Sequence, residues 1–221
     1  MTEYEPNAIV HEYITDYIRS SLSQNTDFLR ELEEYAEKND VPIVQPETAK
    51  LILDLAYMRR PKRILEVGCA IGYSSILLSS ALEPGGSITT LEFDSEMVKI
   101  ARENIEKAGL TDVITVVEAD AKEYLPAISG EECFDYIFLD GPKAHYIYML
   151  EDCVRLLTKR GVLVSDNVLY KGMTATNELV KRRKITIVKR LRKYINALTE
   201  HPALETSILS VGDGVTVSVK K

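Results

Sequence analysis

The amino-acid sequence predicts an α/β fold in which a mostly parallel, seven-stranded sheet follows an N-terminal helical extension and ends in an antiparallel hairpin. From residue 61 onward, short runs rich in β-branched residues alternate with helical stretches. The strand candidates are almost continuously apolar, which is typical of a parallel sheet covered on both faces. The last two candidates flank Gly212-Asp213-Gly214, a typical hairpin turn.

The first 60 residues predict helices. Apolar side chains, including those of Tyr13 and Tyr17, recur at helical spacing over residues 5–23, and a second such stretch covers residues 27–38. Because these segments precede the first strand candidate, they are expected to form an extension of the sheet-containing core.

Capping residues help to place the next two helices. Asn25 or Thr26 could cap the second helix, and Pro46 suits the first position of a third helix that ends near residue 60. The core strands are expected at residues 63–67, 87–92, 113–117, 134–139, 161–165, 204–211 and 214–220. The core helices are expected at about residues 73–82, 95–108, 121–128, 144–157 and 176–199. No repeat or linker interrupts this pattern, so residues 1–221 are expected to form one domain, with helices over 1–60 and the core over 61–221.

Composition limits the class of protein. A chain of 221 residues and 24.9 kDa, 45% of them hydrophobic, can bury a core without disulfides. Its three cysteines, Cys69, Cys133 and Cys153, show no CxxC spacing, which indicates a reducing compartment. The N-terminus lacks the features of a signal peptide, and no apolar run approaches ~18 residues. A cytoplasmic protein without a membrane partner is therefore expected.

The charge is unevenly distributed. The net charge of −7 argues against bulk nucleic-acid binding, but residues 181–193 contain eight basic side chains and no acid. Subtracting these eight charges from −7 leaves −15 on the rest of the chain. The segment is a positive region on an acidic protein.

Several residues at the expected strand ends suit a nucleoside cofactor. The run ILEVGCAIGYSS places Glu66, Gly68 and Gly72 in a turn where the backbone can approach a ligand closely. Glu92 is placed to accept hydrogen bonds from ribose hydroxyls, and Asp120-Ala121 could hold an adenine amino group. Solvated strand ends and a simple tight turn are the alternative. The missing third glycine of GxGxxG disfavours a nicotinamide cofactor, and the combination favours S-adenosylmethionine.

Two neighbouring strands end in acidic residues. Asp140 follows the fourth expected strand, and Asp166-Asn167 follows the fifth. Adjacent parallel strands end side by side, so these oxygen-bearing side chains are expected to converge. Such a set suits a hard cation such as Mg²⁺ and disfavours zinc. The alternative is that each aspartate caps a helix or turn.

With these motifs, the chain resembles the cation-dependent O-methyltransferases of the catechol and caffeoyl-CoA type over essentially its whole length. The resemblance implies a class I, Rossmann-like methyltransferase fold, a metal bound by Asp140, Asp166 and Asn167, and a homodimer formed through the N-terminal helices. It also implies that Lys143 assists deprotonation of the acceptor hydroxyl. By the same match, the residues that contact S-adenosylmethionine are Val44, Ser74, Glu92, Asp120, Ala121 and Asp140.

Lys143 has two interpretations. It can act as a base only if the cation and burial depress its pKa, and a surface lysine on a loop is the alternative. His145, beside Tyr146, is more often structural in such a position, and we do not include it among the catalytic candidates.

The acceptor is expected to be tRNA. The basic segment overlaps the helix expected at 176–199, whose Ile185, Val188, Leu191 and Ile195 can face the core and leave the charges outward. The stretches VPIVQPE and DNVLYKG resemble the tRNA 5-hydroxyuridine methyltransferases of bacteria, which make 5-methoxyuridine at the wobble position. The expected RNA-binding residues are Lys171, Lys181, Arg182, Arg183 and Lys184.

Three other functions remain open. A small-molecule catechol-type methyltransferase would keep every catalytic residue and leave the basic helix as a solvated surface. A non-catalytic RNA-binding module would make the aspartates structural. A nicotinamide-dependent oxidoreductase ranks last because the phosphate-binding fingerprint is absent.

Overall fold

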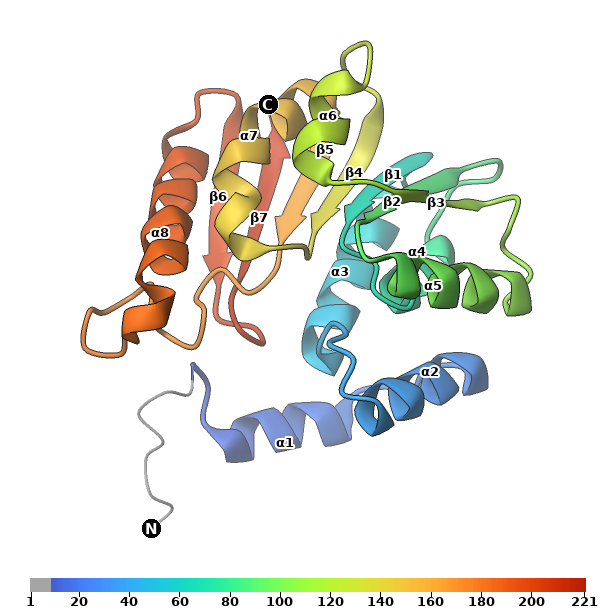
Figure 1. The fold of residues 1–221 in the computed structure, drawn as a ribbon, viewed down its shortest axis with the longest axis horizontal. Coiled ribbons are helices and arrows are strands. Elements are labelled where there is room, and N and C mark those ends of the chain that lie inside the picture. The colour runs from blue at the N-terminus through green and yellow to red at the C-terminus, as the bar shows by residue number, and fades with distance from the viewer. Residues whose placement is uncertain (1–8) are drawn as a thin grey trace.

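The computed structural model describes residues 9–221 and contains one seven-stranded sheet (Figure 1). Its strands are β1 (Arg63–Val67), β2 (Ser87–Glu92), β3 (Ile114–Glu118), β4 (Phe134–Leu139), β5 (Leu157–Ser165), β6 (Leu204–Leu209) and β7 (Val215–Lys220). The strand order is β3-β2-β1-β4-β5-β7-β6. The first five strands pair in parallel, and β7 pairs antiparallel with both β5 and β6. The predicted fold class is therefore confirmed.

Two layers of helices cover the sheet. The helices are α1 (Glu12–Ser21), α2 (Asp27–Lys38), α3 (Pro46–Arg59), α4 (Tyr73–Ser79), α5 (Ser95–Lys107), α6 (Ala121–Ala127), α7 (Tyr146–Leu156) and α8 (Ile185–Glu200), with short 3-10 turns η1 (Lys143–His145) and η2 (Arg182–Lys184). Among residues 9–221, no helix is both long and apolar enough to cross a bilayer.

The sheet separates two hydrophobic cores, and alternating residues of a strand place their side chains in one core or the other. In β4, Tyr136 and Phe138 pack with α3, α4 and α5, whereas Ile137 and Leu139 pack with α6, α7 and α8. All four side chains are fully buried. A strand that is buried on both faces has no polar position along its centre, which explains the continuous apolar runs of the sequence.

The N-terminal helices differ in how firmly they pack. The side chain of Thr26, not that of Asn25, caps α2 by accepting a hydrogen bond from the backbone N–H of Leu29. The first helix begins at Glu12, and residues 5–8 of its expected range lie outside the described residues. No residue of α1 is buried, and Tyr13 and Tyr17 are 60% and 72% exposed, so their helical spacing does not correspond to a buried face.

The helix expected at residues 176–199 is wrong at its N-terminal end. The regular helix begins only at Ile185, after η2, and Lys181 is extended. Within the expected range, the Glu178 N–H donates to the Thr176 hydroxyl and the Val180 N–H donates to the Asn177 carbonyl oxygen, so these residues form turns instead of helical hydrogen bonds. Val188 and Leu191 are buried as expected, but Ile185 is 38% exposed and does not face the core.

Candidate functional site

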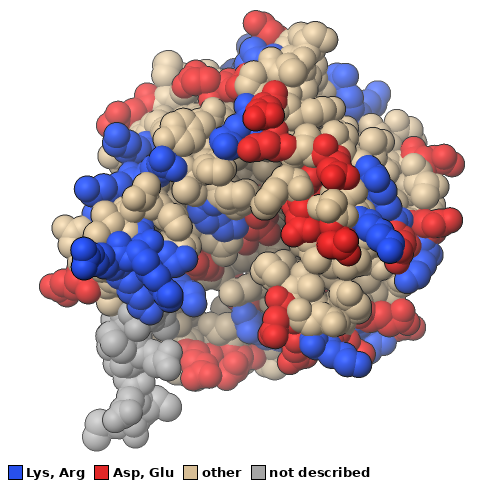
Figure 2. Space-filling model, viewed as in Figure 1, with Lys and Arg blue, Asp and Glu red and all other residues tan. Residues whose placement is uncertain are grey.

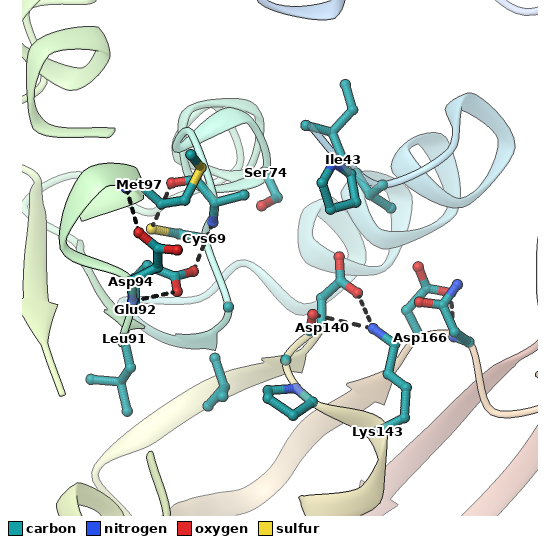
Figure 3. Close-up of a pocket in the computed structure, with 18 of the residues that line it drawn as sticks. Ile43, Cys69, Ser74, Leu91, Glu92, Asp94, Met97, Asp140, Lys143 and Asp166 are labelled. Atoms are coloured by element: carbon teal, nitrogen blue, oxygen red, sulfur yellow. Dashed lines mark hydrogen bonds and ion pairs between the residues drawn. The ribbon is translucent and has the colours of Figure 1, made fainter. Parts of the chain in front are cut away.

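A cavity of about 1160 Å³ opens at the carboxyl ends of β1 to β5 (Figure 3). Parallel strands bring their carboxyl ends to one edge of the sheet, and the loops that follow them form the walls. The segment before α3 and the turn between β6 and β7 complete the lining. The predicted site residues that line the cavity are Val44, Gly68, Ser74, Glu92, Asp120, Ala121, Asp140, Lys143, Asp166, Asn167 and Lys171.

Backbone donors hold Glu92 in a fixed orientation at the end of β2. One carboxylate oxygen accepts a hydrogen bond from the N–H of Ala70 at 3.1 Å. The other accepts from the N–H groups of Phe93 at 2.9 Å and Asp94 at 3.1 Å. The side chain is almost buried but still lines the cavity, so its free lone pairs can accept a hydrogen bond from a ligand hydroxyl.

Asp120 caps the helix that follows β3. Its carboxylate accepts a hydrogen bond from the N–H of Lys122 at 2.9 Å and forms an ion pair with the Lys122 ammonium at 3.2 Å. The backbone hydrogen bond from Lys122 is the main reason that the pKa of Asp120 lies below its usual value. Asp120 is therefore anionic at neutral pH and faces the same cavity as Glu92.

Gly68 permits close contact between the turns after β1 and β4. Its φ is +88°, and a Cβ placed there would lie 2.8 Å from the backbone nitrogen of Gly141. Any other residue would clash with backbone atoms, which have little freedom to move. Gly72 also has a positive φ and precedes α4, but it does not line the cavity.

Glu66, predicted to bind the cofactor, lies beneath the cavity and is not among its lining residues. Its side chain is fully buried, and one oxygen accepts hydrogen bonds from the hydroxyls of Ser75 and Thr90. The other oxygen has no hydrogen-bond partner within residues 9–221. Burial raises the pKa of Glu66. The carboxyl group thus links β1, β2 and α4 beneath the glycine turn. This position corrects the prediction that Glu66 contacts the cofactor directly.

Asp140 and Lys143 form an ion pair on the opposite side of the cavity. The Lys143 ammonium lies 2.6 Å from the Asp140 carboxylate and also donates to the Asp140 carbonyl oxygen at 3.2 Å. Each side chain is 18% exposed, so the pair is largely shielded from water. Lys143 therefore projects into the cavity and is not a solvated surface lysine.

Asp166 lies next to this pair, as Figure 3 shows. It is only 2% exposed, and its carboxylate accepts a hydrogen bond from the N–H of Asn167 at 2.6 Å. Burial raises the pKa of Asp166, and the negative charge of Asp140 raises it further, whereas Lys143 lowers it. Two carboxylates that repel one another in a poorly solvated place are suited to a cation.

The predicted metal ligands fit a hard divalent cation. Asp140, Asp166 and Asn167 all line the cavity and supply only oxygen ligands. The set comprises two carboxylates and one amide, and within residues 9–221 no group of three or more His, Cys, Asp or Glu side chains is placed to hold a metal. Mg²⁺ usually keeps several water molecules, and a set of this size would leave positions for water or for a substrate oxygen.

Asp213 and His145 also line the cavity, although neither was predicted as a site residue. Burial raises the pKa of Asp213 and lowers that of His145. In the sequence, Asp213 is recognisable only as part of the hairpin turn. The antiparallel register provides a signal that could have identified it, because β7 must begin at the edge of the sheet where β5 ends.

The predicted RNA-binding residues separate into two groups. Lys171 lines the cavity, whereas Lys181, Arg182, Arg183 and Lys184 do not. Figure 2 shows basic side chains gathered near the start of α8, and Lys181, Arg182 and Arg183 are exposed there. No ion pair between these four side chains and an acidic group occurs in the described part of the chain. The Lys184 ammonium lies 5.7 Å from the centre of the Tyr170 ring.

Comparison with known proteins agrees with this geometry. Residues 19–221 match the model of the O-methyltransferase family. A catechol O-methyltransferase of Niastella koreensis is 29% identical over 97% of this chain and 100% of its own, and one of Mycobacterium tuberculosis is 30% identical over 76% and 74%. The crystal structure of an O-methyltransferase from Bacillus cereus in complex with SAH superposes with a TM-score of 0.83, at 27% identity, over 95% of this chain and 97% of that one.

Proposed function

The chain belongs to the O-methyltransferase family and is an S-adenosylmethionine-dependent enzyme, and we propose that its acceptor is a small catechol-like molecule with two adjacent oxygen atoms. The observation that carries the proposal is the ion pair of Asp140 and Lys143 beside the buried carboxyl group of Asp166. Two catechol O-methyltransferases among the relatives support the choice of acceptor.

In the proposed complex, S-adenosylmethionine occupies the part of the cavity near β1, β2 and β3. Glu92 would accept hydrogen bonds from the ribose hydroxyls because its carboxylate is already oriented by backbone N–H groups. Asp120 and Ala121 would face the adenine. Val44, Gly68 and Ser74, which also line this cavity, would surround the methionine part of the cofactor.

Asp140, Asp166 and Asn167 would hold Mg²⁺ or another hard divalent cation. Bound there, the cation would lower the pKa of an acceptor hydroxyl and orient its oxygen. Support comes from the raised pKa of Asp166, because a cation would relieve the repulsion between the two carboxylates.

Lys143 would accept the hydroxyl proton at Nζ, for which it must be neutral when the acceptor binds. A nearby divalent cation would favour that neutral form, because like charges repel. As the methyl carbon forms a bond with the acceptor oxygen, its bond to sulfur breaks and the bonding electrons remain on sulfur. The walls of the cavity would align these atoms.

The test is methyl transfer from labelled S-adenosylmethionine to 3,4-dihydroxybenzoate, with Mg²⁺ and with EDTA. We expect monomethylated products that form only in the presence of a divalent cation. Turnover that persists unchanged in EDTA would contradict the metal assignment, and the absence of product with bound S-adenosylmethionine would contradict the choice of acceptor.

One observation favours a second acceptor, the 5-hydroxyuridine of tRNA. Lys171 lines the cavity, and the exposed, unpaired cations of residues 181–183 lie near the start of α8, where they could contact phosphates. A triple variant with Arg182, Arg183 and Lys184 changed to alanine tests this function. The matched control changes three exposed lysines elsewhere to alanine, namely Lys38, Lys62 and Lys107.

If tRNA is the acceptor, wild-type enzyme will form 5-methoxyuridine in tRNA that carries 5-hydroxyuridine. The first triple variant should then lose about tenfold in kcat/KM for tRNA, and its rate should depend less on salt. The control should resemble wild type. Equal tRNA kinetics in both variants would contradict the docking of tRNA on this surface.

A further inference from the structure

The loop between β5 and α8 has an unusual backbone where it meets the cavity. Asn167, Tyr170 and Lys171 have positive φ angles of 56°, 48° and 55°, and Gly172 follows at 74°. For residues other than glycine, this conformation costs about 1–2 kcal/mol each, so surrounding contacts must hold it in place. Tyr170 and Lys171 both line the cavity on the side of Asp166 and Asn167.

The turn between β6 and β7 holds the first part of this loop. Asp213 accepts a hydrogen bond from the Lys171 N–H on its carboxylate and one from the Leu169 N–H on its carbonyl oxygen at 3.1 Å. The Val168 N–H donates to the Gly214 carbonyl oxygen at 2.9 Å. A Cβ on Gly214 would lie 2.3 Å from a Leu169 carbon, so only glycine allows this approach.

Arg192 of α8 holds the second part of the loop. Its guanidinium donates three hydrogen bonds: to the carbonyl oxygens of Met173 at 3.0 Å and Thr174 at 2.9 Å, and to the side chain of Asn177 at 2.7 Å. Thr174 in turn donates through its hydroxyl to the Leu169 carbonyl oxygen at 3.0 Å. The planar guanidinium suits this task, because it offers several donors in a fixed arrangement.

We propose that Arg192 and Asp213 are positioning residues that fix Tyr170 and Lys171 as one wall of the acceptor pocket and thereby select which acceptor hydroxyl is methylated. Neither residue needs to touch the reacting atoms. Asp213 contacts the backbone of Leu169 and Lys171, Arg192 contacts the backbone of residues 173 and 174, and these contacts lie away from the cofactor side of the cavity. The selection of a hydroxyl rests on the proposed function, whereas the fixing of the loop does not.

The first measurement is hydrogen exchange of the loop amides, which needs no turnover. Arg192→Met removes all three donors, and Arg190→Met is the matched control, because Arg190 lies on the same helix and its guanidinium is placed over the Tyr148 ring at 5.2 Å. We expect residues 168–175 to exchange about tenfold faster in Arg192→Met than in the control, as expected for a loss of about 1.4 kcal/mol. Equal exchange in the two variants would overturn the proposal.

The second measurement is the ratio of the two monomethyl products from 3,4-dihydroxybenzoate, whose hydroxyls are not equivalent. In Arg192→Met we expect this ratio to move toward one and the acceptor KM to rise about tenfold, with the Kd of S-adenosylmethionine unchanged within about twofold. Arg192→Lys should restore part of the selectivity, because the ammonium group still donates hydrogen bonds, although from a single nitrogen. Faster loop exchange with an unchanged product ratio would refute the selective role.

Asp213 is tested by a pair of variants. Asp213→Asn retains an oxygen that can accept the Lys171 N–H, so it should resemble wild type in exchange and product ratio, whereas Asp213→Ala should resemble Arg192→Met. Equal defects in both would show that the negative charge matters and not the hydrogen bond. If wild-type enzyme forms neither product, the proposed function fails, and loop exchange alone decides whether these residues hold the loop.

Discussion

The two sides of the cavity place their carboxylates in different surroundings. At the ends of β2 and β3, Glu92 and Asp120 accept hydrogen bonds mainly from the N–H groups of the residues that follow them. At the ends of β4 and β5, Asp140 and Asp166 are close enough for their charges to interact, and only Asp140 has a cation in direct contact. The carboxylates of the first side are therefore stabilised by backbone N–H groups before any ligand binds. The second side is suited to a bound cation and a proton transfer.

Replacing the amine on the acceptor side should produce the largest effect. We expect Lys143→Met to lower kcat about a thousandfold, as removal of a general base commonly does. The Kd of S-adenosylmethionine should change little, because the cofactor side keeps all its contacts. Single-turnover rates and calorimetric binding would measure the two quantities. If Lys143→Met lost both cofactor binding and turnover, the assignment of separate roles to the two sides of the cavity would be contradicted.

Weakening the cation site should have the next largest effect. Asp166→Asn keeps an oxygen that can accept the Asn167 N–H, so the loop is expected to keep its shape. The variant removes one negative charge, and we expect the Mg²⁺ concentration for half-maximal activity to rise about a hundredfold. Titration of activity with Mg²⁺ measures this shift. If the Mg²⁺ concentration for half-maximal activity is the same in Asp166→Asn and wild type, Asp166 is not a metal ligand.

Changing the cofactor side should give a smaller effect of a different kind. In Glu92→Gln, an amide N–H₂ group replaces one of two oxygens that accept backbone hydrogen bonds. We expect the affinity for S-adenosylmethionine to fall about tenfold, while kcat at saturating cofactor stays within about threefold. Initial rates over a range of cofactor concentrations separate the two. A decrease in kcat without a loss of cofactor affinity would contradict this assignment and indicate that Glu92 acts in the methyl-transfer step.

The smallest effect concerns stability and pH. Because burial raises the pKa of Glu66 in the folded protein, wild-type enzyme binds more protons than its unfolded chain above the ordinary pKa of 4.5, and its stability falls as pH rises through that region. Glu66→Gln removes this dependence. Between pH 4.5 and pH 8, the unfolding free energy of the variant should therefore rise relative to that of wild type. Urea unfolding of wild type and variant at both pH values measures the difference. An equal change in unfolding free energy with pH in the two proteins would contradict a raised pKa of Glu66.

Much of the cofactor side could be predicted from local sequence. The turn at Gly68, the acid that ends β2 and the Asp120 cap each depend on residues close to them in the chain. The acidic ends of β4 and β5 were also predictable, because parallel topology brings neighbouring strand ends together. The alternation of apolar strands and helices, and with it the fold class, belongs to the same group of features.

Other features depend on contacts between distant residues. Whether Glu66 faces the cavity or lies beneath it depends on Thr90, 24 positions away, which donates a hydrogen bond to it. The shape of the loop after β5 depends on Asp213, 42 positions beyond Lys171. The helix expected from residue 176 begins only at Ile185, and Asn177 in the segment before it accepts a hydrogen bond from Arg192, 15 positions away.

By itself, the sequence determined the sheet, its glycine turn and the acids at its strand ends, because short-range spacing and strand direction are sufficient to define them. Only the tertiary structure decided which acid is buried beneath the cavity, which loop lines the cavity beside Asp166, and that Arg192 and Asp213 form hydrogen bonds with that loop. These choices depend on hydrogen bonds between segments that become neighbours only when the chain folds, and no local pattern records which partner a side chain will meet.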